Sequence, residues 1–143
     1  MRTQNVPPAM LEDSTVSVKL KLAALWSGFM FLYLYVDYFA LYMPGKLEDI
    51  LQGKVYVFNI TQGFILAALV SVTIPALLIF LSVALPAKVN RPVNISIAVL
   101  YIPYSLFNLA GEVWAHMVFG AVAETVLLGF IIRYAWKWPS VET

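Results

Sequence analysis

The sequence contains no cysteine, and only 12% of its 143 residues are charged. Without cysteine the chain cannot form disulfides, thiolate metal sites or a thiol nucleophile. About a quarter of the residues in a typical soluble domain are charged, so this chain lacks the polar side chains needed to cover a globular surface. Its formal net charge of +1 gives no reason to expect a nucleic-acid partner.

The sequence also lacks the local motifs of several enzyme classes. It has no glycine-rich phosphate loop and no nucleophile elbow, and its single histidine cannot supply bis-histidine haem ligation within one chain. Asp37, Glu112 and His116 are side chains that can bind Zn or Fe, but only a similar expected depth in the membrane connects them. We therefore predict no metal site, and nothing in the sequence indicates a particular cofactor.

Hydrophobic residues make up 62% of the chain and are concentrated in four stretches. A membrane-spanning helix needs roughly 20 residues at 1.5 Å per residue, and each stretch reaches or approaches that length. Four buried helices of a soluble protein are the alternative, but such helices would show polar faces. We predict an all-α membrane protein, an antiparallel four-helix bundle over residues 19–139, between a mobile polar tail (1–18) and a short C-terminal tail (140–143). The predicted spans are 22–43, 60–85, 93–110 and 113–132.

Proline and glycine mark the predicted ends of these spans. Pro44-Gly45 ends the first span, because proline cannot continue a helix and glycine suits the turn. Pro86 and Pro92 bracket a predicted loop, and Gly111-Glu112 marks a tight turn that would make the last two helices an antiparallel hairpin. Pro75 lies inside the second predicted span, where it removes a helix hydrogen bond and frees a backbone carbonyl that could line a cavity; a role in packing alone is the alternative.

The longest connection, residues 45–58, contains apolar residues at helical spacing: Leu47, Ile50 and Leu51. This spacing favours a short amphipathic helix on the membrane surface, with an irregular loop as the alternative. The connection holds two lysines, whereas seven basic residues lie on the side of the two termini. The positive-inside rule then places both termini in the cytoplasm. The seven are Arg2, Lys19, Lys21, Lys88, Arg91, Arg133 and Lys137.

One carboxylate, Asp37, interrupts the aromatic end of the first span. At 1.5 Å per residue it lies roughly 9 Å inside the boundary set by Met43. A charged carboxylate in hydrocarbon costs about 2.5 kcal/mol or more, so we expect Asp37 to face the bundle interior and to be partnered or protonated. The alternative is that Asp37 reaches the outer interface, or makes a structural hydrogen bond to a neighbouring helix.

The last span carries the candidate partners of Asp37. Glu112 and His116 are four residues apart and lie on one helix face, a row that Gly120 and Glu124 continue. His116 lies at a depth similar to that of Asp37, which suggests an Asp–His pair. Glu124 lies near the membrane midplane. Because an ionisable side chain at that depth is energetically costly, Glu124 is a functional candidate. A protonated Glu124 that donates a hydrogen bond to another helix is the alternative.

Further polar residues collect in the outer half of the predicted bundle and suggest a vestibule narrowing towards Glu124. The candidate ligand or proton site therefore comprises Asp37, His116, Glu124, Glu112, Tyr33, Gln62, Tyr104 and Asn108. Small residues recur at intervals of four in the last span, which permits close helix packing within one chain or in a homo-oligomer. This row is Ala121, Thr125 and Gly129.

Two segments resemble a bacterial family of small four-span membrane proteins that has no assigned activity. They are LYLYVDYFALYMPG, residues 32–45, which embeds Asp37 among aromatic residues, and YAWKWP, residues 134–139. The resemblance covers roughly residues 19–139. It implies four spans and the bacterial inner membrane, and it brings no activity or catalytic residue. Four-span redox families such as vitamin K epoxide reductase need cysteines that are absent here.

Three function classes follow from these observations. The leading hypothesis is a small membrane protein, embedded in the lipid bilayer, that binds or transports a small ligand or a proton through an outer-half cavity. The second is a non-enzymatic subunit of a larger membrane complex. The third is an acid–base enzyme acting on a lipidic substrate. The only support for it is the presence of carboxylates that have no assigned role.

Overall fold

The computed structural model describes residues 15–110 and 113–139. In these residues the chain is mostly helical, and the predicted all-α class is confirmed, with one small hairpin added. The predicted turn at Glu112 and the two tails beyond 15–139 lie outside the described residues. In chain order the elements are α1 (Val18–Ala40), α2 (Lys46–Leu51), β1 (Lys54–Val55), β2 (Phe58–Asn59), α3 (Gln62–Ala84), α4 (Ala87–Phe107) and α5 (Ala115–Trp136).

Three helices, α1, α3 and α5, are long and apolar enough to cross a membrane. They contain 23, 23 and 22 residues. The remaining predicted span, residues 93–110, lies largely on α4, which is 21 residues long but is not among the three. Its first two turns contain Lys88, Asn90, Arg91 and Asn94, which lower the apolar character of the whole helix.

The ends of α1 follow local rules. Ser17 caps its N-terminus, accepting a hydrogen bond from the Leu20 backbone N–H through its hydroxyl (3.3 Å). At the other end the chain turns at Gly45, whose φ of +83° is costly for residues with a Cβ. The helix break predicted at Pro44-Gly45 is therefore confirmed, and α2 begins at the next residue.

The loop predicted between Pro86 and Pro92 is wrong, because α4 begins at Ala87 and contains Pro92. Pro92 has no backbone N–H, so the helix loses the hydrogen bond to the Lys88 carbonyl. This carbonyl lies in the exposed first turn of α4. The Asn90 side-chain amide donates to the carbonyls of Ser82 (2.6 Å) and Leu85 (3.4 Å). It thereby caps the end of α3 and fixes a sharp connection between the two helices.

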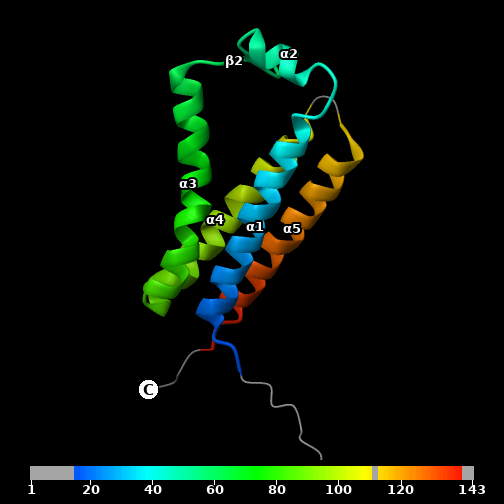
Figure 1. The fold of residues 1–143 in the computed structure, drawn as a ribbon. Coiled ribbons are helices and arrows are strands. Elements are labelled where there is room, and N and C mark those ends of the chain that lie inside the picture. Colours follow the sequence, from blue (N-terminus) through cyan, green and yellow to red (C-terminus); the bar gives the residue numbers. More distant parts are fainter. Residues whose placement is uncertain (1–14, 111–112, 140–143) are drawn as a thin grey trace, which may run out of the picture.

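The four long helices pack unequally (Figure 1). Helix α1 packs against both α3 and α5, α5 also packs against α4, and α3 meets α4 only weakly. Figure 1 shows α3 diverging from α4 towards the end that bears α2. The antiparallel arrangement of α4 and α5 agrees with the predicted hairpin. The core consists of Leu22, Trp26, Phe29, Leu78, Ala98, Tyr101, Leu128, Ile131 and Ala135.

Helices α1 and α5 approach each other closely at Gly120, where a Cβ would overlap the Val36 side chain. The small-residue row predicted beside it has a different environment at each position. Ala121 is buried and its carbonyl accepts the Thr125 hydroxyl (2.7 Å), whereas a Cβ at Gly129 would meet no atom within 4 Å. Whether the exposed part of this row packs against a second chain remains a prediction.

Residues 41–61, the cap segment, connect α1 to α3 across one end of the bundle, here called the capped end (Figure 1). The predicted helix is present as α2, followed by a β-hairpin that the sequence did not predict. Its strands pair Lys54 with Asn59 and Val55 with Phe58. Tyr56 begins the turn at φ +53°.

The opposite end, where α1 begins and α5 ends, is here called the terminal end. Four fully buried side chains form a hydrogen-bonded network there. Asn94 Oδ1 accepts from Trp26 Nε1 (2.7 Å) and Ser82 Oγ (3.1 Å), and Asn94 Nδ2 donates to the Asn90 side-chain oxygen (2.5 Å) and backbone carbonyl (2.9 Å). Because three helices contribute, the network ties α1, α3 and α4 together.

Candidate functional site

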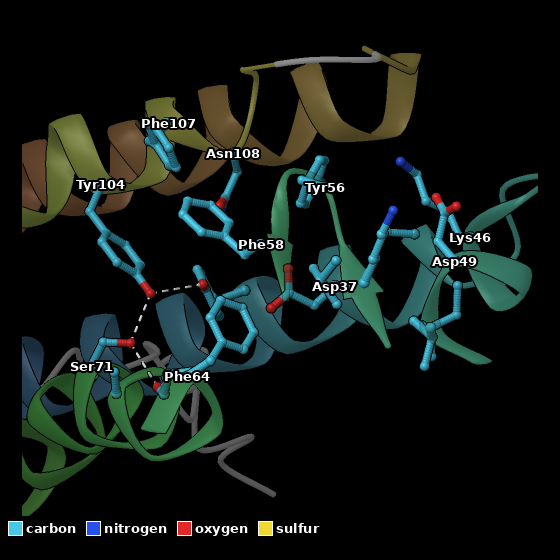
Figure 2. Close-up of a pocket in the computed structure, with 18 residues that line it drawn as sticks. Asp37, Lys46, Asp49, Tyr56, Phe58, Phe64, Ser71, Tyr104, Phe107 and Asn108 are labelled. Atoms are coloured by element: carbon cyan, nitrogen blue, oxygen red, sulfur yellow. Dashed lines mark hydrogen bonds between the residues drawn. The ribbon is translucent and has the colours of Figure 1, made fainter. Parts of the chain in front are cut away.

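A cavity of about 500 Å³ lies beneath the cap segment, between α1, α3 and α4. This volume falls within the range of small-molecule sites. The cap segment forms the roof of the cavity, and residues of α1, α3 and α4 form its walls. Figure 2 shows the aromatic and charged side chains that point into it. Aromatic side chains dominate the lining, namely Tyr33, Tyr56, Phe58, Phe64, Tyr104 and Phe107.

Asp37 projects into this cavity from the last turn of α1 (Figure 2). Its side chain is exposed to the cavity. Within residues 15–110 and 113–139 its carboxylate forms no hydrogen bond or ion pair. The same segment of α1 packs on α5 through Val36, so the helix is oriented with Asp37 towards the cavity.

Hydroxyl groups form the end of the cavity nearest the core. The Tyr33 hydroxyl donates to the Tyr104 hydroxyl (3.3 Å), and the Tyr104 and Ser71 hydroxyls lie 2.8 Å apart. Ser71 Oγ in turn donates to the Ala68 carbonyl (2.7 Å), so Tyr104 must donate to Ser71. The protons of all three hydroxyls are thus used, and what they offer to a ligand is acceptor lone pairs.

A proline stabilises this arrangement from behind. Pro75 lacks a backbone N–H, so the Ser71 carbonyl has no helical partner, and the Tyr101 hydroxyl donates to it instead. The sequence predicted that Pro75 would free a carbonyl in the bundle. The freed carbonyl anchors α4 to α3 next to the hydroxyl chain.

The roof carries three further charges, Lys46, Asp49 and Lys54. Lys46 Nζ lies 4.7 Å from the centre of the Tyr56 ring, a cation–π contact. Burial, and after it the negative charge of Asp37, raise the pKa of the Tyr56 hydroxyl. Asp37 therefore acts electrostatically on a residue of the roof, Tyr56. Among the described residues, none of these charged groups forms an ion pair.

Glu124 does not line the cavity. It lies in the core between α5 and α4, 1% exposed, near the Ser105 hydroxyl and within electrostatic range of Asp37. Neither Glu124 Oε1 nor Ser105 Oγ has a hydrogen-bond partner among the described residues. The predicted vestibule therefore ends at the hydroxyl chain, and Glu124 lies outside it.

The structure divides the remaining predicted site residues. Tyr33, Tyr104 and Asn108 line the cavity with Asp37, whereas Gln62 and His116 do not. The His116 ring packs edge-on against Trp114, with centroids 6.2 Å apart, and its Nε2 is buried without a hydrogen-bond partner among the described residues. The structure thus does not bring Asp37 and His116 together as a pair. Glu112 lies outside the described residues.

Several lining residues were not predicted from the sequence. Phe58 and Phe64 stack with centroids 5.8 Å apart and join the hairpin to α3, and Ala67 and Ala68 leave room beside them. Phe64 and Ala68 are four residues apart and Ser71 follows three residues later, a spacing that places them on one helix face. That spacing was a usable signal, but without the hairpin nothing distinguished this face from a lipid-facing one.

Comparison with known proteins gives a family and no activity. A model of a family of unknown function, DUF6326, matches residues 12–143. No curated protein and no solved structure matches the chain. The expectation of a family without assigned activity is thus confirmed, while its bacterial origin stays a prediction. The match spans most of the chain, including every residue that lines the cavity, and the protein therefore belongs to the DUF6326 family.

Proposed function

We propose that this protein is a four-span membrane protein that binds a small ligand in the cavity beneath its cap segment. One observation carries the proposal, namely that Asp37 extends into a cavity of about 500 Å³ and has no partner among the described residues. A carboxylate at membrane depth is costly and is a functional candidate by default. Asp37 is the group that would recognise the ligand.

The packing of α4 supports a fourth span. At 1.5 Å per residue a 21-residue helix is about 31 Å long, enough to cross the hydrocarbon core. Its polar residues Asn90 and Asn94 are fully buried and hydrogen-bonded, so they would not face lipid. With four spans both termini lie on one side of the membrane.

Basic residues support a cytoplasmic location for the terminal end. Lys21 contacts the ring of Tyr134, and Arg91 the ring of Trp136, which is the combination favoured at membrane interfaces. The capped end, with its two lysines, would then face outwards. The resemblance of residues 32–45 and 134–139 extends the proposal to the bacterial inner membrane.

The cavity is best suited to a ligand with a donor or cationic group. Asp37 and the lone pairs of Tyr33 and Tyr104 are acceptors, and the aromatic walls favour cations through their ring faces. A ligand amine would satisfy these groups without requiring a donor from the protein. The two roof lysines and Asp49 line the cavity from the cap segment.

The absence of cysteine allows a direct test with single-cysteine variants. Ala68→Cys would be reacted at pH 7.5 with a cationic methanethiosulfonate reagent (MTSET) and with its anionic counterpart (MTSES). Each rate would be normalised to Gln52→Cys, because Gln52 lies on the cap segment but does not line the cavity. We expect the cation-to-anion rate ratio at Ala68→Cys to fall at least threefold when Asp37→Asn is added.

The control ratio at Gln52→Cys should not change with Asp37→Asn. If Ala68→Cys reacts with neither reagent, the cavity does not admit polar molecules and the proposal is wrong. A ratio that is unaffected by Asp37→Asn would likewise remove Asp37 from the recognition of a ligand.

A further inference from the structure

The seam between α3 and α4 borders the cavity, because residues of both helices line it. Helix α3 packs along α1 but meets α4 only weakly, and it diverges from α4 towards the capped end (Figure 1). Phe64, Ala67 and Ala68 line the cavity from α3, and Phe107 lines it from α4. Ala67 and Ala68 are exposed, and Phe107 is 63% exposed.

This side of the cavity is apolar. In a four-span arrangement the seam between α3 and α4 faces hydrocarbon, since no other helix of the described chain covers it. The residues that line the cavity on this side, Phe64, Ala67 and Ala68 of α3 and Phe107 of α4, are themselves apolar. An apolar chain could therefore lie in the seam while a polar group reached the cavity.

Polar groups inside the cavity select the head of such a molecule. Asp37 is the charged lining residue that lies on a membrane-spanning helix, and it is unpartnered among the described residues. The hydroxyls of Tyr33, Tyr104 and Ser71 have committed their protons to one another and to the Ala68 carbonyl. Apart from the Asn108 amide and the two roof lysines, the polar groups that remain are acceptors, so the complementary head at Asp37 is a donor with positive charge.

We propose that the ligand is an amphiphilic amine, with its ammonium group at Asp37 and its alkyl chain in the seam between α3 and α4. This inference rests on the proposed function and adds the chemical class of the ligand and its route from the bilayer. A primary alkylammonium remains charged at neutral pH, as lysine does. It would satisfy Asp37 and the tyrosine oxygens together.

Three probes separate the contributions of the head and the chain. Dodecylamine has both the ammonium and the chain, dodecanol has the chain without the charge, and butylamine has the charge with a short chain. Binding of each to the full-length protein would be measured by native mass spectrometry from one detergent. We expect dodecylamine to bind at least tenfold more tightly than either of the other probes.

Matched variants locate the bound amine. Asp37→Asn should weaken dodecylamine binding at least tenfold, whereas Glu48→Gln, on α2 but outside the cavity lining, should leave it unchanged. Ala68→Leu would fill the seam side of the cavity and should weaken binding at least fivefold. Ala76→Leu, at an exposed position of α3 outside the cavity, is its control.

The outcomes are distinguishable from those of the proposed function. If butylamine binds as tightly as dodecylamine and depends on Asp37, the seam has no role and the amphiphile is excluded, although the cavity still binds a ligand. If dodecanol binds as tightly as dodecylamine, or Asp37→Asn has no effect on any probe, the amine assignment is wrong. The cation-to-anion rate ratio at Ala68→Cys tests the proposed cavity independently of these binding measurements.

Discussion

The two ends of the bundle handle buried polar groups in opposite ways. At the terminal end, Trp26, Ser82, Asn90 and Asn94 are hydrogen-bonded to one another and fully buried. Towards the capped end, Asp37 has no partner among the described residues and extends into a cavity. Polar groups that satisfy each other stabilise a fold, whereas a polar group without a partner is available to a ligand.

The same contrast applies to the cations. At the terminal end, Lys19 Nζ donates to the Val83 carbonyl (3.1 Å) and so caps α3, while Lys21 and Arg91 contact rings of α5. At the capped end, Lys46 likewise contacts a ring, that of Tyr56, whereas Lys54 lines the cavity and forms no hydrogen bond or ion pair with the described residues. One end is a closed structural unit, and the other holds charged groups around a cavity.

The largest expected effect concerns which side of the membrane each end faces. Alkaline phosphatase, which is active only outside the cytoplasm, would be fused after Gly53 in the cap segment or at the C-terminus. The excess of basic residues at the terminal end predicts activity for the cap fusion and none for the C-terminal fusion. The reverse pattern would show that the bundle is inserted the other way round.

The second effect would disrupt the network of the terminal end. Asn94→Leu removes the acceptor of Trp26 Nε1 and Ser82 Oγ, and an unsatisfied buried donor costs about 1–3 kcal/mol. We expect the free energy of unfolding in detergent to fall by about that amount. Ser96→Leu, an exposed position two residues further along α4, is the control and should change stability by less than about 0.5 kcal/mol.

A smaller effect is expected where α1 meets α5. Gly120→Ala adds a Cβ that overlaps Val36, and overpacking of this kind costs about 1–3 kcal/mol, offset by up to about 1 kcal/mol from the better helix propensity of alanine. Gly129→Ala has open space around it and should be neutral or stabilising. Equal thermal stability of the two variants would mean that Gly120 is not a packing position.

The sequence predicted the helical class, the break at Pro44-Gly45, the helix α2 and the role of Pro75, because each depends on local chemistry. It failed at Pro86–Pro92, where two prolines indicated a loop. Tertiary contacts decided that segment, since the Asn90 amide satisfies the carbonyls at the end of α3. The buried network went unrecognised because its members are 4 to 68 residues apart in sequence.

The candidate site was predicted in part. The sequence assigns Tyr33, Asp37, Tyr104 and Asn108 to one site, and the cavity brings these four together. The assignment of His116 rests on depth, which carries no information about rotation around the helix axis, and His116 does not line the cavity. The hairpin that roofs the cavity consists of two-residue strands, which are too short to produce an alternating pattern.

The smallest expected effect is the coupling between Asp37 and His116. If Asp37 and His116 formed the pair inferred from depth, the effects of Asp37→Asn and His116→Gln on the free energy of unfolding would be non-additive. Because the structure does not bring the two residues together, we expect the double variant to equal the sum of the single variants within about 0.5 kcal/mol. A larger coupling energy in thermal unfolding would restore the pair.

The division between a structural end and a binding end is tested most directly by the free energy of unfolding of Asp37→Asn. It would be measured against the parent protein in one detergent, at fixed pH and without added ligand. If Asp37 is reserved for a ligand, the variant should be as stable as the parent within about 0.5 kcal/mol. A loss of about 3–5 kcal/mol, as when one member of a buried ion pair is removed, would show that Asp37 holds the fold together and would contradict this division.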